Sequence, residues 1–189
     1  MNRFHQCLLI GSFLPLCWLG MMAVHELGHV LAAWSTGGTV ARVVLHPLAI
    51  SRTDVEPNPA PLVVAWGGPL AGVALPLLIW AVFAAARIPG VYLWRFFAGF
   101  CLIANGAYIG AGSFERIGDA GEMLRHGTPI WLLWLFGLST VPAGLFLWHR
   151  LGPRFGLGES QGAVDARAAY LSALLLLLAT AVALAFRLR

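Results

Sequence analysis

Five long stretches of almost uninterrupted apolar residues follow one another along the chain. Each has the length of about 20 residues that an α-helix needs to cross the hydrocarbon layer of a membrane. Charged residues gather in the segments between them. The pattern therefore predicts an all-α polytopic membrane protein with about five transmembrane helices, over residues 6–34, 60–86, 91–113, 129–148 and 168–186.

The composition agrees with this class. Of the 189 residues, 59% are hydrophobic and 11% are charged, whereas a soluble domain carries about 25% charged residues. The formal net charge is +4, but no basic cluster alternates with aromatic residues, so we expect no binding to nucleic acid. We expect a single domain over residues 1–189, embedded in the lipid bilayer of a membrane of the bacterial cytoplasmic type.

The first apolar stretch argues against a cleaved signal peptide, and the cysteines argue against a disulfide-linked or thiolate metal-binding protein. The start of the chain imitates a secretory signal peptide, but apolar residues continue to Trp34 without a small-residue cleavage pattern, so we expect a retained first span. The cysteines, Cys7, Cys17 and Cys101, lie in apolar stretches and form no C-x-x-C pair. We therefore expect packed thiols, with neither a disulfide framework nor a thiolate zinc site.

Between the first two spans, a β-branched segment predicts a small interfacial β-hairpin. Its strands are expected over residues 39–45 and 48–52, around His46-Pro47. An exposed edge of this hairpin would pair with an extended peptide by β-augmentation. An ordinary interfacial hairpin explains the same pattern, and His46 is expected to be an interfacial residue, not a ligand.

An HExxH motif, His25-Glu26-Leu27-Gly28-His29, lies inside the first apolar stretch. Residues four apart share a helix face, so His25 and His29 can present two imidazoles to one metal ion. Glu26 lies beside them, where a general base for hydrolysis must be. A carboxylate at bilayer depth costs about 2.5–3.5 kcal/mol on insertion scales, which argues against a purely structural role. The motif predicts a membrane hydrolase with Zn²⁺ as its cofactor.

Catalytic zinc sites usually have three protein ligands, so a third must come from elsewhere. The candidates cluster just after the third span, and Asp119 is our choice. It is flanked by Gly118 and Gly121, which allow the backbone to approach a site closely. Three other residues of this segment compete with Asp119 on position alone: Glu115, Glu122 and His126.

These motifs together resemble the site-2-protease family of intramembrane zinc metalloproteases. The HExxH is followed by Gly67-Gly68-Pro69-Leu70-Ala71-Gly72, which is similar to the family's glycine-proline motif, and by Gly118-Asp119 at the place of its Asp-Gly motif. The resemblance runs from His25 to about Arg125. It implies that His25, His29 and Asp119 bind zinc and that Glu26 activates water. It also implies cleavage of peptide bonds in a transmembrane protein or peptide substrate.

The chain departs from the family pattern at several positions. Gly72 stands where the motif commonly ends in Asn, Ala120 stands where Gly follows the aspartate, and no PDZ-like domain is inserted. A minimal or divergent member is therefore expected. Asn105 would supply a substrate-binding amide or, equally, a hydrogen bond between helices. The G-x-x-x-G spacing of Gly68 and Gly72 predicts close helix approach.

A non-catalytic membrane zinc protein is the alternative, either a pseudoprotease or a metal-handling protein. A carrier would need metal-binding groups spread across the membrane, whereas here they are confined to one motif and one loop. A pseudoprotease would usually lose the base, and Glu26 is present. The protease is the favoured prediction, with the oligomeric state left open.

Overall fold

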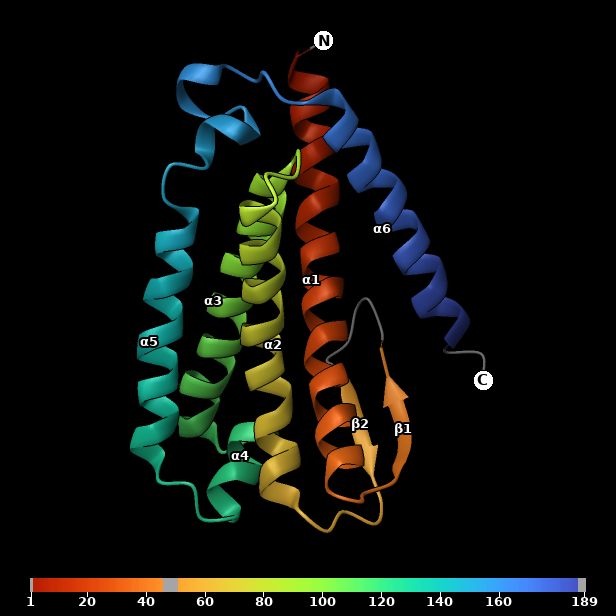
Figure 1. The fold of residues 1–189 in the computed structure, drawn as a ribbon, viewed down its shortest axis with the longest axis vertical. Coiled ribbons are helices and arrows are strands. Elements are labelled where there is room, and N and C mark those ends of the chain that lie inside the picture. The colour runs from red at the N-terminus through yellow and green to blue at the C-terminus, as the bar shows by residue number, and fades with distance from the viewer. Residues whose placement is uncertain (1, 46–50, 187–189) are drawn as a thin grey trace.

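The computed structural model describes residues 2–45 and 51–186 (Figure 1). Five of its helices are long and apolar enough to cross a membrane, which confirms the predicted class. They match the predicted stretches to within about one helical turn at each end. The long helices are α1 (Asn2–Ser35), α2 (Pro61–Ala85), α3 (Val91–Glu115), α5 (Ile130–Trp148) and α6 (Ala166–Phe186).

Within the described residues, five short elements connect the long helices. α4 (Gly118–Arg125) follows α3, and two 3₁₀ turns, η1 (Gly152–Phe155) and η2 (Gly158–Ser160), lie between α5 and α6. The strands β1 (Val40–Val44) and β2 (Arg52–Val55) lie between α1 and α2. In Figure 1 the hairpin and α4 both lie at the end of the bundle opposite the N-terminus.

The helices form a bundle in which α1, α2 and α3 each pack between two other long helices, while α5 and α6 lie at its edges. α3 packs against α2 and α5, while α1 packs against α2 and α6. Figure 1 shows α6 leaning away from α1 toward the C-terminal end of the chain. The helices that carry the predicted site, α1 to α4, are therefore mutually packed.

The strands pair antiparallel, with Val43 opposite Thr53 and Val44 opposite Arg52. The first strand lies within the predicted range. The second strand, as far as it is described, runs from Arg52 to Val55, so it continues three residues beyond the predicted end at residue 52, and Ser51 is not part of it. β2 alternates charged with β-branched residues, which is a strand pattern that a search for apolar residues misses. His46 and the predicted strand residues 48–50 lie outside the described residues.

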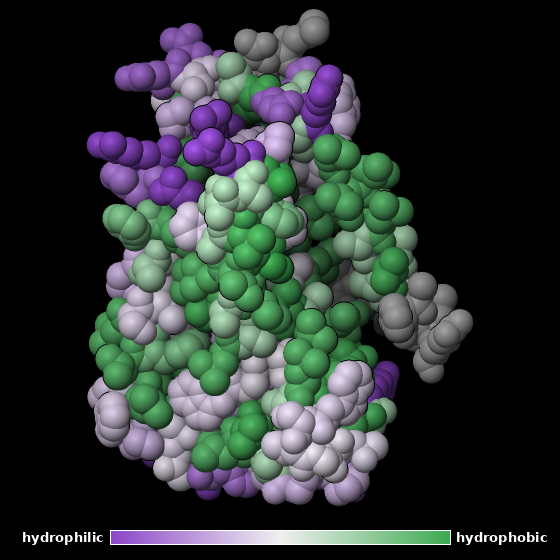
Figure 2. Space-filling model, viewed as in Figure 1, coloured by the Kyte–Doolittle hydropathy of each residue, from purple (hydrophilic) through white to green (hydrophobic). Residues whose placement is uncertain are grey.

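Two apolar clusters hold the bundle together at opposite ends. Near the N-terminus, Leu9, Phe13 and Phe155 join α1 to η1. Near the other end, a cluster joins α2, α3, α4 and α5, made of Ala65, Ile109, Ala120, Met123 and Leu133. Figure 2 shows hydrophobic side chains over the middle of the molecule, and hydrophilic ones gathered at the end where the N-terminus lies. This surface suits a lipid environment around the middle of the bundle.

α1 and α2 approach each other most closely at two glycines. A Cβ atom on Gly28 would lie 2.2 Å from the carbonyl oxygen of Gly67, and one on Gly67 would lie 2.5 Å from the Cβ of Ala32. Both distances are far shorter than van der Waals contact. The backbones of the two helices therefore pack directly against each other beside the HExxH motif.

We expect Gly28→Ala to destabilise the bundle by about 1–3 kcal/mol, because the added methyl group must push α1 and α2 apart. The matched control is Gly11→Ala, also in α1, where an added Cβ meets nothing within 4 Å. That control should be neutral or slightly stabilising, since alanine favours a helix by about 1 kcal/mol over glycine. Thermal unfolding of both variants in detergent measures the difference, and equal midpoints would contradict the close contact.

Candidate metal centre

The HExxH side chains lie buried on the face of α1 that packs against α2 and α3. His25, Glu26 and His29 are 7%, 3% and 6% exposed. Their ligand atoms all lie within 4.8 Å of one another. Three ionisable groups of one helical turn are therefore held together inside a bundle whose other buried residues are mostly apolar.

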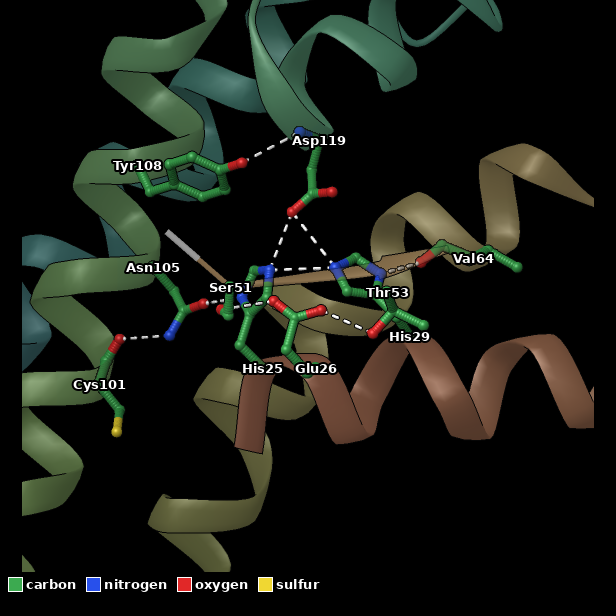
Figure 3. Close-up of polar contacts among 10 residues, drawn as sticks. All are labelled: His25, Glu26, His29, Ser51, Thr53, Val64, Cys101, Asn105, Tyr108 and Asp119. Carbon is green, nitrogen blue, oxygen red and sulfur yellow. Dashed lines mark hydrogen bonds and ion pairs between the residues drawn. The ribbon is translucent and has the colours of Figure 1, made fainter. Parts of the chain in front are cut away.

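The structure brings Asp119 to the two histidines (Figure 3). Its Oδ2 lies 2.9 Å from Nε2 of His25 and 3.4 Å from Nε2 of His29. The two Nε2 atoms lie 3.1 Å apart. A tetrahedral zinc ion with bonds of about 2.0–2.1 Å separates its ligand atoms by about 3.3 Å. The three atoms thus already have the mutual spacing that such an ion requires.

Each imidazole is oriented by a hydrogen bond from its other nitrogen. Nδ1 of His29 donates to the carbonyl oxygen of Val64 at 2.7 Å. Nδ1 of His25 lies 2.7 Å from Oδ1 of Asn105, whose Nδ2 donates to the carbonyl oxygen of Cys101 at 2.9 Å. Because the amide nitrogen is used on Cys101, the amide oxygen faces His25 and accepts its proton. Both rings then turn Nε2 toward Asp119, as metal-binding histidines do.

This arrangement favours a cation between the three side chains. With the Nδ1 hydrogens donated to Val64 and Asn105, the two Nε2 lone pairs and a carboxylate oxygen face one another at 2.9–3.4 Å. Such acceptors repel one another unless a proton or a metal ion lies among them. One carboxylate and two imidazoles form a donor set that suits zinc. The residues therefore fit the metal that the motif predicts.

Asp119 reaches the histidines because α4 is fixed against the bundle. The hydroxyl of Tyr108 on α3 accepts the backbone N–H of Asp119 at 3.2 Å. Gly118 has a φ of +54°, and a Cβ there would lie 2.0 Å from that hydroxyl, so only glycine fits. Ala120 and Met123 are fully buried, which anchors the rest of α4. The short helix is thereby held with its first turn over the histidine pair.

The Asp119 carboxyl is held in its charged form. Burial tends to raise its pKa, but the close contacts with His25 and His29 outweigh burial and lower the pKa to about 2. An ionised carboxylate is the form that binds a metal ion.

The competing acids lie elsewhere. Glu115 is exposed at the end of α3. Glu122 forms ion pairs on the outer side of α4, with Arg125 and, at 3.6 Å, with His126. Of the four sequence candidates, Asp119 is the one that contacts the histidine pair.

Glu26 does not contact Asp119 but accepts two hydrogen bonds from the hairpin. Ser51 Oγ donates to Oε1 and Thr53 Oγ1 donates to Oε2, both at 2.6 Å (Figure 3). Sequence reasoning missed both hydroxyls, and it missed Tyr108 and the contact of Asn105 with His25. Nothing in the sequence distinguishes Ser51 and Thr53 from other hydroxyl residues of a polar loop.

The glycine-proline segment of α2 makes room for these side chains. A Cβ on Gly68 would lie 2.3 Å from Nε2 of His29 and 2.8 Å from Nε2 of His25. A Cβ on Gly72 would lie 2.7 Å from the amide of Asn105. The G-x-x-x-G pair thus accommodates site side chains, whereas Gly67 makes the backbone contact with α1. The amide of Asn105 lies where a side chain on residue 72 would begin.

Comparison with known proteins gives no match to a family model, to a curated protein or to a solved structure. The chemistry of the site must therefore be derived from its own side chains.

We expect Asn105→Ala to lower the affinity for zinc by about 10- to 100-fold, because His25 loses the acceptor that orients it. Competition with a chromophoric chelator on the purified protein measures this affinity. Ser113→Ala is the control, since Ser113 is also a buried polar residue on α3 but bonds to Gly110 and Trp134. Equal affinities in the two variants would contradict the orienting role.

Proposed function

We propose that this chain is an intramembrane zinc metalloendopeptidase that hydrolyses peptide bonds of transmembrane substrates. The observation that carries the proposal is the convergence of Nε2 of His25, Nε2 of His29 and Oδ2 of Asp119 beside the buried carboxylate of Glu26. The resemblance of these motifs to the site-2-protease family supports the same activity. A membrane of the bacterial cytoplasmic type remains the proposed location.

His25, His29 and Asp119 would hold the zinc ion, which leaves a fourth position for water or substrate. When bound, zinc acts as a Lewis acid that makes a water molecule acidic near neutral pH and polarises a peptide carbonyl. The Asp119 side chain is 18% exposed, more than either histidine. Water therefore has its most direct route to the site past Asp119, at the α4 end of the bundle.

Glu26 is the proposed general base. Its carboxylate lies within 4.8 Å of the histidine ligand atoms, which is close enough for one water molecule to contact both. An Oε atom of Glu26 would take the proton from that water and later give it to the nitrogen of the leaving amine. The apolar helices around the site keep other water away from this exchange.

The substrate must present an extended segment, because a helix hides its carbonyl groups in backbone hydrogen bonds. The hairpin is the candidate clamp for that segment, since a strand edge can pair with an extended peptide. β2 already lies against α1 at the level of Glu26, through the contact of Thr53. His25 lies ten residues before the end of α1 at Ser35, or about 15 Å along the helix axis. A cleavage site inside the membrane, near this end of the bundle, follows from that depth.

The first test is metal content. Wild-type protein purified in detergent should bind one zinc per chain, and His29→Ala and Asp119→Ala should each lose it, because two remaining ligands hold zinc weakly. Glu122→Ala is the matched control and should keep the metal, since Glu122 pairs with Arg125 and His126 on the outer side of α4. Wild-type protein that binds no zinc after loading would rule out the enzyme.

The second test is peptide hydrolysis. Zinc-loaded protein in liposomes is given a library of synthetic transmembrane peptides, and the products are read by mass spectrometry. Glu26→Gln should keep its zinc and lose cleavage by about 100-fold or more, as expected when a general base is removed. Stoichiometric zinc with no cleavage of any peptide would favour the non-catalytic zinc protein. Cleavage by Glu26→Gln at the wild-type rate would remove Glu26 from the mechanism.

A further inference from the structure

The Glu26 carboxylate is bound at both oxygens by residues of the hairpin. The 2.6 Å distances from Ser51 Oγ and Thr53 Oγ1 are those of hydrogen bonds to an ionised carboxylate. Glu26 is 3% exposed, so few other partners can reach it. These two bonds are therefore the main restraint on the direction in which the carboxylate points.

Strand geometry explains how both hydroxyls reach one side chain. Ser51 immediately precedes β2 and Thr53 lies within it. Residues two apart on a strand point to the same face. One face of this segment thus presents two donors to the two oxygens. A carboxylate held at both oxygens cannot turn about its terminal torsion, which is otherwise a broad and weakly restrained angle.

The hairpin that carries these hydroxyls is itself anchored at its base. The N–H of Gly38 donates to the carbonyl of Ala33 at the end of α1, at 2.8 Å. Thr39 exchanges backbone hydrogen bonds with the two residues that follow β2: its N–H donates to the carbonyl of Pro57 at 3.1 Å, and its carbonyl accepts from the N–H of Glu56 at 2.8 Å. The hairpin therefore folds back along α1 from a fixed starting point. Its register then places Thr53 beside Glu26.

The two bonds leave the carboxylate able to act. An ionised carboxylate has about four lone-pair sites, and the two hydroxyls use two of them. Among the described residues no other side chain bonds to the remaining sites, so one of them can accept a proton from water. The same two bonds would also be needed if the hydroxyls only stabilised a buried charge. The two roles, stabilising the charge and positioning the base, therefore differ in how removing the hydroxyls changes the reaction rate.

We propose that Ser51 and Thr53 are positioning residues that hold the Glu26 carboxylate in the orientation from which it takes a proton. This inference rests on the proposed function, and it makes the hairpin part of the reaction centre as well as a clamp for substrate. The hydroxyls act through Glu26 and do not touch the reacting atoms. Their loss should slow the chemical step without changing how the substrate is bound.

The test uses Ser51→Ala and Thr53→Val, which remove the hydroxyls and change the shape of the side chains little. With the peptide that the wild-type chain cleaves fastest, each variant should lose about 10-fold in kcat, with KM unchanged and zinc content unchanged. Thr53→Ser should restore kcat, because it restores the hydroxyl. Ser139→Ala, at an exposed serine of α5 away from the hairpin, is the control and should behave as wild type.

Infrared spectroscopy supplies a readout that does not depend on cleavage. The carboxylate band of Glu26 is identified from the difference between wild type and Glu26→Gln. It should shift in Thr53→Val and return in Thr53→Ser. An unshifted band, an unchanged kcat, or a loss of kcat that Thr53→Ser does not restore would each overturn the positioning role. A wild-type chain that cleaves no peptide would refute the proposed function instead, and the band would still report on the two hydroxyls.

Discussion

The direct backbone contact between α1 and α2 is the constraint on which the site depends. Gly28 and Gly67 let the two helices approach closely enough for the side-chain Nδ1 of His29 on α1 to donate to the backbone carbonyl of Val64 on α2. Gly68, one residue along α2, leaves open the space into which the two Nε2 atoms point. A wider helix pair would separate His29 from its acceptor. A side chain at residue 68 would fill the position that the proposed metal needs.

The rest of the site follows from burial. Polar groups placed among apolar helices are costly unless each finds a partner. Here the partners come from four different parts of the chain: a backbone carbonyl on α2, an amide on α3, the carboxylate of Asp119 on α4, and two hydroxyls of the hairpin. The polar side chains of α1 thereby fix the relative positions of the elements around it. Ala120 and Met123 of α4 pack in the apolar cluster between α2, α3 and α5, and this packing holds α4 in the same position.

Much of this arrangement could be predicted from the sequence. The lengths of the apolar stretches indicated the five spans, because bilayer thickness limits helix length. Helical spacing placed His25 and His29 on one face, and the glycines beside Asp119 indicated a close approach of the backbone. The structure brings these three residues together. The roles assigned to them stay predictions.

Other features depend on contacts that no local pattern records. β2 is built from Arg52 to Val55, and its strand character comes from pairing with β1 more than from apolar residues. Asn105 contacts His25 across 80 positions of sequence, and Ser51 and Thr53 contact Glu26 across 25 and 27 positions. Gly68 and Gly72 resemble a helix-packing pair, but the space they leave is filled by side chains from α1 and α3. Such distinctions require the three-dimensional arrangement.

The hydrogen bonds to the two Nδ1 atoms orient both imidazoles through contacts within the protein. In a zinc finger the ion itself organises the chain, and the apo form is unfolded. Here Val64, Asn105 and Tyr108 orient the ligands through contacts that the protein makes on its own. On the proposed function, a membrane population of this chain that had lost its zinc would keep these contacts. The same chains would regain the proposed activity when the ion returned, without new synthesis.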